Sequence, residues 1–266
     1  MSRSVVLTAL TVAVALVPLA VLAQTPPAAT PSPTPEEPMS AERLRDEVLH
    51  QLAGWRLGAA EEALDAHRAE LGSTPEFQTA HGVLLAAKGK TADGLKQLES
   101  AVGKLPADPV APFWRGEVVY WSQTYSAATA HWETARSRAQ GLVGKDPKDA
   151  RARYYLGAAQ VRLKKYGDAR GNLDAALANG WSAAQVHAMR GLAELFDKKY
   201  QPAVDVLTRG AEADARFAPL YFYRGLAWNQ LGKKDRMLND MDTFVKLAPS
   251  HPDSSKAKVY LSSAGG

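Results

Sequence analysis

Residues 156–176 read LGAAQVRLKKYGDARGNLDAA and contain the pattern from which the fold can be inferred. Gly157 is followed after twelve residues by the small Ala169 and, four residues later, by the large Leu173. Two side chains four residues apart lie on the same side of a helix. The stretch therefore predicts two helices joined by a polar turn, in which the glycine of the first helix lets the second pack closely against it.

The same pattern occurs five times at a nearly constant period. The repeated glycines follow one another at steps of 34, 41, 34 and 34 residues, and they are Gly82, Gly116, Gly157, Gly191 and Gly225. A large apolar residue stands sixteen positions after each of them, namely Leu98, Trp132, Leu173, Leu207 and Met241. A fixed period in this range indicates stacked supersecondary units that share one core. A glycine inside a helix costs about 1 kcal/mol against alanine, so its return at one phase implies a packing reason.

These residues give the chain a resemblance to the tetratricopeptide repeat (TPR) family. The resemblance is carried by Leu156–Gly157, Ala169, Leu173 and Ala176 and by the 34-residue spacing, and it covers residues 75–249. It implies an all-α fold, a right-handed α-solenoid of antiparallel helix hairpins that binds a protein or peptide on its concave side. The repeats are expected at 75–106, 109–147, 148–182, 183–216 and 217–249, within a domain of residues 40–266 that starts with a degenerate hairpin at 40–74 and ends with a capping helix at 252–263.

Two features depart from the usual pattern of the family. Arginine precedes three of the repeated glycines where leucine is common, and no tryptophan stands four residues before any of them. The position directly after each glycine also lacks the asparagine with which one branch of the family holds a peptide carboxylate; it is occupied by Val83, Glu117, Ala158, Leu192 and Leu226. We therefore do not expect a carboxylate clamp.

The single irregular step is 41 residues, which is 34 plus 7. Seven residues make about two helical turns, so an insertion of this length keeps the buried face in phase. The step therefore predicts a long second helix near residues 126–143. The alternative is a loop marked by Gly141 and Gly144.

The first 23 residues have the pattern of a secretory signal peptide. Arg3 precedes an apolar run from Val5 to Leu22, and we expect cleavage after Ala23. Residues 24–39 are proline-rich and predict an extended linker. The protein is therefore expected to be exported, either periplasmic or secreted. The alternative is an N-terminal membrane anchor with the domain outside the cytoplasm, because an apolar run of about 18 or more residues can span a bilayer.

Composition and spacing argue against several classes of function. The chain has 32 basic and 28 acidic residues, a net charge of +4 and no basic run, so we expect no nucleic-acid partner. Its six histidines include no pair three or four residues apart, which argues against a metal site on one helix. It has no cysteine, hence no thiol nucleophile or disulfide, and no Gly-x-Ser-x-Gly motif. We therefore expect neither an enzyme nor a cofactor.

The inner faces of the first helices form the candidate binding surface. On each of them, the positions six and three before the glycine and one and four after it are expected to face inward. The partner-binding residues predicted from this register are Phe113, Glu117, Tyr120, Arg151, Tyr154, Leu192, Leu195, Phe222, Leu226 and Asn229. The surface is largely apolar, which suits an amphipathic helix or an extended apolar segment of a partner.

We therefore predict an exported, non-enzymatic scaffold or adaptor that binds a protein or peptide in an apolar concave groove. Two alternatives remain open at this point. The first is a self-assembling structural protein of the cell envelope, whose apolar faces stack between copies. The second is a regulatory subunit of an envelope enzyme. Aromatic residues at helical spacing also serve as ordinary packing between neighbouring repeats, so the groove residues have a purely structural interpretation as well.

Overall fold

The computed structural model describes residues 38–122 and 125–263. The signal peptide predicted at 1–23 lies outside the described residues, and so does the linker predicted at 24–39 up to residue 37. From Met39 onwards the described chain forms one compact unit.

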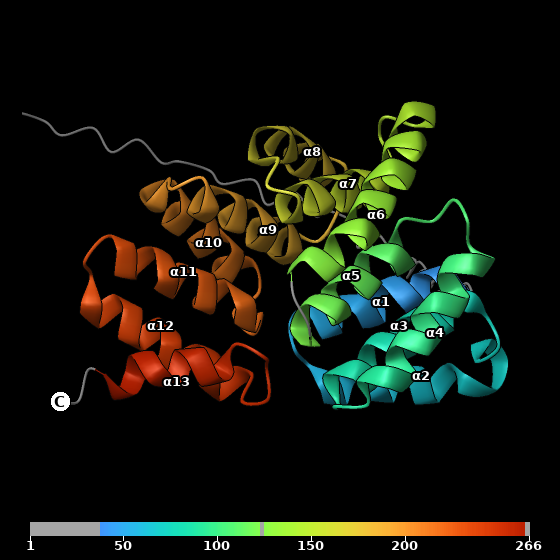
Figure 1. Cartoon of the computed structure of the whole chain (residues 1–266), viewed down its shortest axis with the longest axis horizontal. Coiled ribbons are helices and arrows are strands. Elements are labelled where there is room, and N and C mark those ends of the chain that lie inside the picture. The colour runs from blue at the N-terminus through green and yellow to red at the C-terminus, as the bar shows by residue number, and fades with distance from the viewer. Residues whose placement is uncertain (1–37, 123–124, 264–266) are drawn as a thin grey trace, which may run out of the picture. The chain divides into compact units, whose positions relative to one another are not determined.

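This unit consists of helices, and the described residues contain no strand (Figure 1). The helices are α1 (Ala41–Ala53), α2 (Leu57–Leu71), α3 (Pro75–Ala87), α4 (Thr91–Lys104), α5 (Val110–Ser122), α6 (Tyr125–Lys145), α7 (Ala150–Arg162), α8 (Tyr166–Ala178), α9 (Ala183–Phe196), α10 (Tyr200–Ala213), α11 (Ala218–Gln230), α12 (Lys234–Leu247) and α13 (Ser254–Ser262). None of the helices in the described part is both long and apolar enough to cross a membrane.

The helices are arranged in two layers. Each odd-numbered helix from α1 to α11 packs on the even-numbered helix that follows it, as in the pairs α3–α4, α7–α8 and α11–α12. The odd-numbered helices from α1 to α11 also pack on one another in order and so form an inner layer, whereas the even-numbered helices lie outside. The predicted all-α solenoid is confirmed.

The repeated glycines mark the points where the two helices of a pair approach each other. A Cβ atom on Gly157 would lie 2.7 Å from Cγ of Leu173, and one on Gly191 would lie 2.3 Å from Cγ of Leu207. A Cβ atom on Gly82 would lie 2.9 Å from the carbonyl oxygen of Gly94. One on Gly116 would lie 2.5 Å from Nε1 of Trp132, and one on Gly225 would lie 2.8 Å from Cε of Met241. Real Cβ atoms do not approach other heavy atoms this closely. The prediction that glycine is needed for close helix packing is therefore confirmed at Gly82, Gly116, Gly157 and Gly191, whereas the neighbour of Gly225 is the flexible end of Met241.

The irregular step is occupied by α6, which has 21 residues. Gly141 and Gly144 both lie inside this helix, so the alternative of a loop there is wrong. Its buried residues, which include Trp132, Ala139 and Val143, keep the helical spacing to the end. Figure 1 shows the C-terminal part of α6 standing clear of the neighbouring ribbons.

The last helix begins later than the sequence suggested. Pro252 precedes α13 instead of standing in its first turn. The backbone N–H of Asp253 donates to Nδ1 of His251 at 3.0 Å, and the Ser254 hydroxyl donates to the carbonyl of Ala248. These hydrogen bonds hold residues 248–253 as a turn, after which α13 packs on α12.

Candidate functional site

A cavity of about 540 Å³ lies on the inner layer of the solenoid, and we refer to it as the central pocket. All the helices that line it are odd-numbered: α1, α5, α7, α9, α11 and α13. Its walls are mainly aromatic, with Trp55, Phe113, Trp114, Tyr120, Trp121, Tyr154, Phe196, Phe217, Phe222, Tyr223 and Tyr260 among the lining residues. Both its volume and its apolar walls are typical of binding pockets, which span about 300–1,000 Å³.

Seven of the ten predicted partner-binding residues line this pocket. They are Phe113, Glu117, Tyr120, Tyr154, Leu192, Phe222 and Leu226. Most of them are buried, so they form the wall of the pocket and part of the core at the same time. Tyr120 is the most accessible of the seven. The inner face was thus placed in the correct register, while the role of these residues in partner binding stays a prediction.

The other three predicted residues lie elsewhere. Arg151 donates to Glu42 of α1 at 2.8 Å, so its charge is engaged within the protein. Leu195 is buried in the hydrophobic core. Asn229 is exposed in the last turn of α11, outside the central pocket. The structure therefore brings none of these three side chains to the pocket.

Six of the pocket residues that the sequence prediction missed occupy two further columns of the repeat. Trp121, Arg162 and Phe196 stand five residues after their glycines, and Trp114, Met189 and Tyr223 stand two residues before theirs. These two columns are seven residues apart, which is about two helical turns, so they form one continuous stripe. The signal was present in the repeat alignment, but the predicted inner face was too narrow to include it.

A buried ion pair joins the walls formed by α5 and α7. Nε of Arg162 donates to Oε1 of Glu117 at 2.8 Å, and the indole N–H of Trp132 donates to the same oxygen at 3.0 Å. The side chains of Glu117 and Arg162 are 6% and 12% exposed. Burial lowers the pKa of Arg162, but the carboxylate of Glu117 outweighs this effect and the pKa stands above its usual value. The pair therefore presents a fixed dipole to the pocket and no free charge.

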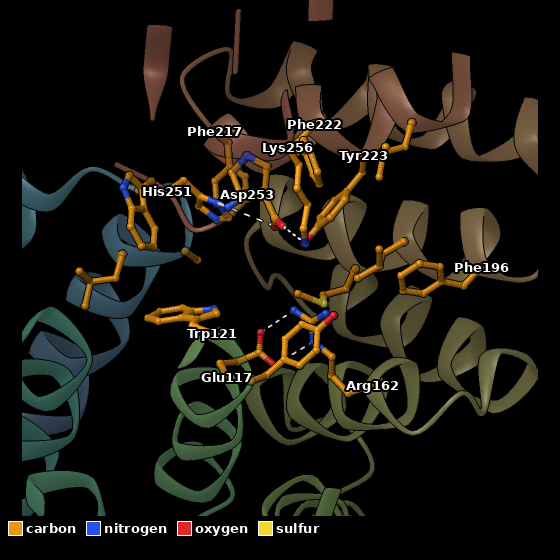
Figure 2. A pocket seen from close by; sticks show the side chains of 18 of the residues that line it. Glu117, Trp121, Arg162, Phe196, Phe217, Phe222, Tyr223, His251, Asp253 and Lys256 are labelled. Atoms are coloured by element: carbon orange, nitrogen blue, oxygen red, sulfur yellow. Dashed lines mark hydrogen bonds and ion pairs between the residues drawn. The ribbon is translucent and has the colours of Figure 1, made fainter. Parts of the chain in front are cut away.

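The opposite wall carries a second polar group, formed by the turn before α13 and by α13 itself (Figure 2). Asp253 accepts a hydrogen bond from Nζ of Lys256 at 2.7 Å, and its backbone N–H donates to Nδ1 of His251. Burial lowers the pKa of His251 to about 4, so its imidazole is neutral at neutral pH. Figure 2 shows these residues across the pocket from Glu117 and Arg162, with aromatic rings around the two groups.

The first and last hairpins meet at Trp55, which stands in the turn after α1. Its Nε1 donates to Oγ of Ser250 at 3.0 Å, and its ring lies 4.5 Å from the ring of His251. Next to it, Arg56 pairs with Asp214 at 2.7 Å. Trp55 has a φ of 62°, a left-handed conformation that costs roughly 1–2 kcal/mol for a residue other than glycine. The contacts of its buried ring offset this cost and bound the pocket on one side.

The chemistry of the central pocket is suited to binding. Its aromatic walls provide apolar area, and its acidic groups are already engaged with Arg162 and Lys256. Within residues 38–122 and 125–263, no group of three or more His, Cys, Asp or Glu side chains is placed to hold a metal ion.

Comparison with known proteins finds this fold among solved structures, whereas no family model and no curated protein matches the sequence. A thermophilic TPR protein of Thermus thermophilus is similar with a TM-score of 0.56 and 19% identity, over 72% of this chain and 98% of that chain. The chain has a TPR-like fold. At this identity the likeness shows the fold alone.

Two further TPR structures are also similar. A tetratricopeptide repeat protein of Parabacteroides merdae ATCC 43184 has a TM-score of 0.45 and 18% identity, over 85% of this chain and 92% of that chain. YrrB, described as a TPR protein with an unusual peptide-binding site, has a TM-score of 0.39 and 17% identity, over 74% and 97%.

Proposed function

We propose that this protein is a non-enzymatic interaction protein that binds an apolar segment of a partner protein in the central pocket. The observation that carries this proposal is the position of its exposed apolar side chains. In the described part of the chain the large apolar side chains with high exposure are Tyr120 at 40%, Tyr125 at 36%, Phe196 at 50% and Val259 at 66%. Three of them line the central pocket, and Tyr125 lies beside Tyr120 with ring centroids 6.5 Å apart. Apolar surface gathered around a concave site marks an interaction site.

The origin of these exposed residues supports a macromolecular partner. Tyr120 belongs to α5, Phe196 to α9 and Val259 to α13, so one ligand at the rim would contact three separate helices. A helix or an extended segment of a protein can place apolar side chains at such intervals. The polar groups of the pocket support binding over catalysis, because a general base needs an unengaged group whose pKa lies near the working pH.

Site-specific photo-crosslinking in the cells that produce the protein tests this proposal. A photoreactive phenylalanine derivative is placed at Phe196 or at Val259, and at Gln140 as a control, because Gln140 is exposed on α6 and lines neither wall of the pocket. These sites are preferable to Tyr154 and Phe222, which are buried and whose replacement would disturb the core.

We expect both pocket positions, and not Gln140, to crosslink to the same partner through an apolar segment that mass spectrometry can map. Adducts of equal yield at Gln140 would contradict the proposal. Adducts between two copies of this chain would favour the self-assembling structural protein instead.

We further propose that the solenoid acts outside the cytoplasm. The support is the apolar run from Val5 to Leu22 behind Arg3. The intact mass of the protein purified from its own cells tests this proposal. We expect a chain that begins after Ala23, or an intact chain that fractionates with membranes and is accessible to protease from outside. A full-length chain in the soluble cytoplasmic fraction would contradict export.

A further inference from the structure

A smaller cavity of about 180 Å³ adjoins the central pocket, and the two share Tyr120, Arg162 and Phe196. This side pocket lies between the end of α5, the first turns of α6, the turn between α7 and α8, and the last residue of α9. Of the four highly exposed apolar side chains, Tyr120, Tyr125 and Phe196 line it. A cavity of about 150 Å³ with apolar walls can hold a benzene ring. The side pocket therefore has room for one aromatic side chain.

The rings that line the side pocket are held in place by the protein itself. Trp132 is fully buried, and the ring centroids of Tyr120 and Tyr125 lie 5.7 Å and 5.5 Å from it. The Tyr125 hydroxyl donates to the backbone carbonyl of Arg162 at 2.6 Å. A guest ring would therefore meet tilted and edge-on neighbours, of which Trp132 is fixed by burial and Tyr125 by its hydrogen bond. This favours aromatic contacts and lowers the entropic cost of binding.

The charged residues that line the side pocket are both cations. Arg162 is neutralised by Glu117. Lys164 takes part in none of the ion pairs of the described residues. Its Nζ lies 4.8 Å from the centre of the Tyr125 ring. The acidic Asp197 of the neighbouring turn is engaged with Arg170 and Lys199. A cation that makes no ion pair with the described residues thus stands at the edge of an aromatic cavity.

We infer that the side pocket is a specificity pocket for an aromatic side chain of the partner that has a carboxylate close to it in sequence. The inference rests on the proposed function and names the chemistry of the partner: a segment in which Phe, Tyr or Trp stands beside Asp or Glu. The ring occupies the cavity, and the carboxylate pairs with Lys164. An exposed ion pair changes affinity by about fivefold at most, so the ring supplies most of the affinity and the charge supplies the preference.

Selection of short random peptides displayed on phage tests the inference. The peptides are selected on the whole chain, on Lys164→Gln and on Lys198→Gln. Lys198 is the matched control, because it stands at the equivalent place in the turn between α9 and α10, has the same φ of 61° and is also exposed. It lines neither pocket.

We expect peptides selected on the whole chain and on Lys198→Gln to carry an acidic residue next to an aromatic one. Peptides selected on Lys164→Gln should keep the aromatic residue and lose the acidic one. A fluorescently labelled peptide from the first selection should bind Lys164→Gln about three- to fivefold more weakly than the whole chain, and Lys198→Gln equally well. It should bind Phe196→Ala about tenfold more weakly or worse, as expected for an aromatic residue at the centre of a contact.

The outcomes separate this inference from the proposed function. Selected aromatic peptides that lack the acidic residue, or that keep it on Lys164→Gln, would overturn the inference. If their binding still depends on Phe196, the proposed function remains supported. Selected peptides that bind Phe196→Ala as well as the whole chain would overturn both the inference and the proposed function. A selection that enriches no peptide over a blank surface would also overturn both.

Discussion

Replacing Gly191 by alanine should destabilise the solenoid, although the same change at other helical positions stabilises it. Gly191 lies on α9 and faces Leu207 of α10. A Cβ atom at this position would lie 2.3 Å from Cγ and 2.5 Å from Cδ2 of Leu207, which is completely buried. The leucine cannot move away without displacing its own neighbours, because protein interiors are close-packed.

Two opposing contributions set the magnitude. Alanine gains about 1 kcal/mol over glycine in helix propensity. Overpacking a core costs about 1–3 kcal/mol, and so short a contact places Gly191 at the upper end of this range. The net loss in the free energy of unfolding is therefore about 2 kcal/mol, which lowers the Tm of a domain of this size by about 4–8 °C.

Gly171→Ala is the matched control. Gly171 lies inside α8, is exposed, and a Cβ atom there would have no neighbour within 4 Å. The substitution should raise the free energy of unfolding by up to about 1 kcal/mol. Thermal unfolding followed by far-UV circular dichroism would measure both effects, and they should have opposite signs.

A double-mutant cycle tests the proposed cause. In the background of Leu207→Ala the clash is absent, so Gly191→Ala should become neutral or stabilising. An equal penalty in both backgrounds would refute the explanation that contact between these two residues makes glycine necessary.

The Glu117–Arg162 pair should tolerate the loss of both charges better than the loss of one. Glu117→Ala should cost about 3–5 kcal/mol by leaving a buried guanidinium unpaired, and the joint change to Glu117→Met and Arg162→Met should cost less in denaturant unfolding; an equal or greater cost would contradict this. Burial lowers the pKa of the His251 imidazole from 6.5 to about 4 in the folded protein, and Asp253 offsets this only partly. As the pH falls, the imidazole is therefore protonated in the unfolded chain before it is protonated in the folded protein. This contribution to stability is fully present above pH 6.5 and is lost towards pH 4, about 3 kcal/mol in all; His251→Asn should flatten that part of the profile, and an unchanged profile would argue against it. Trp55→Ala should cost about 3–5 kcal/mol and speed hydrogen exchange in α13, because it removes the buried ring between the first and last hairpins; unchanged exchange would show that the two hairpins do not depend on each other.

The sequence by itself determined the helix pairs and the contacts inside them. Gly157 and Leu173 are sixteen residues apart and meet across a single hairpin, so the periodicity of one repeat is enough to predict their contact. The same periodicity placed seven of the ten predicted residues on the central pocket. Both results concern neighbours within a repeat or along one helix face, where the period of about 3.6 residues controls which side chains meet.

Only the tertiary structure decided which distant elements close the pocket. The partners Trp55 and Ser250 are 195 residues apart, and Arg151 reaches Glu42 over 109 residues. Small rotations between successive repeats add up along a solenoid, and no single repeat encodes their sum. The turn after α1 illustrates the consequence. Local preference assigns the positive φ to Gly54, yet Trp55 adopts it at 62° and Gly54 has a φ of −83°. A Cβ atom on Gly54 would lie 3.2 Å from the ring of Phe217, directly before α11, so a side chain here would require that ring to shift by a few tenths of an ångström. Lys164 and Lys198 have nearly the same φ at the equivalent place, so the turn that ends the first helix of a pair sets this conformation. The contacts of the Trp55 ring with Ser250 and His251, which only the tertiary structure creates, explain why a tryptophan occupies it here.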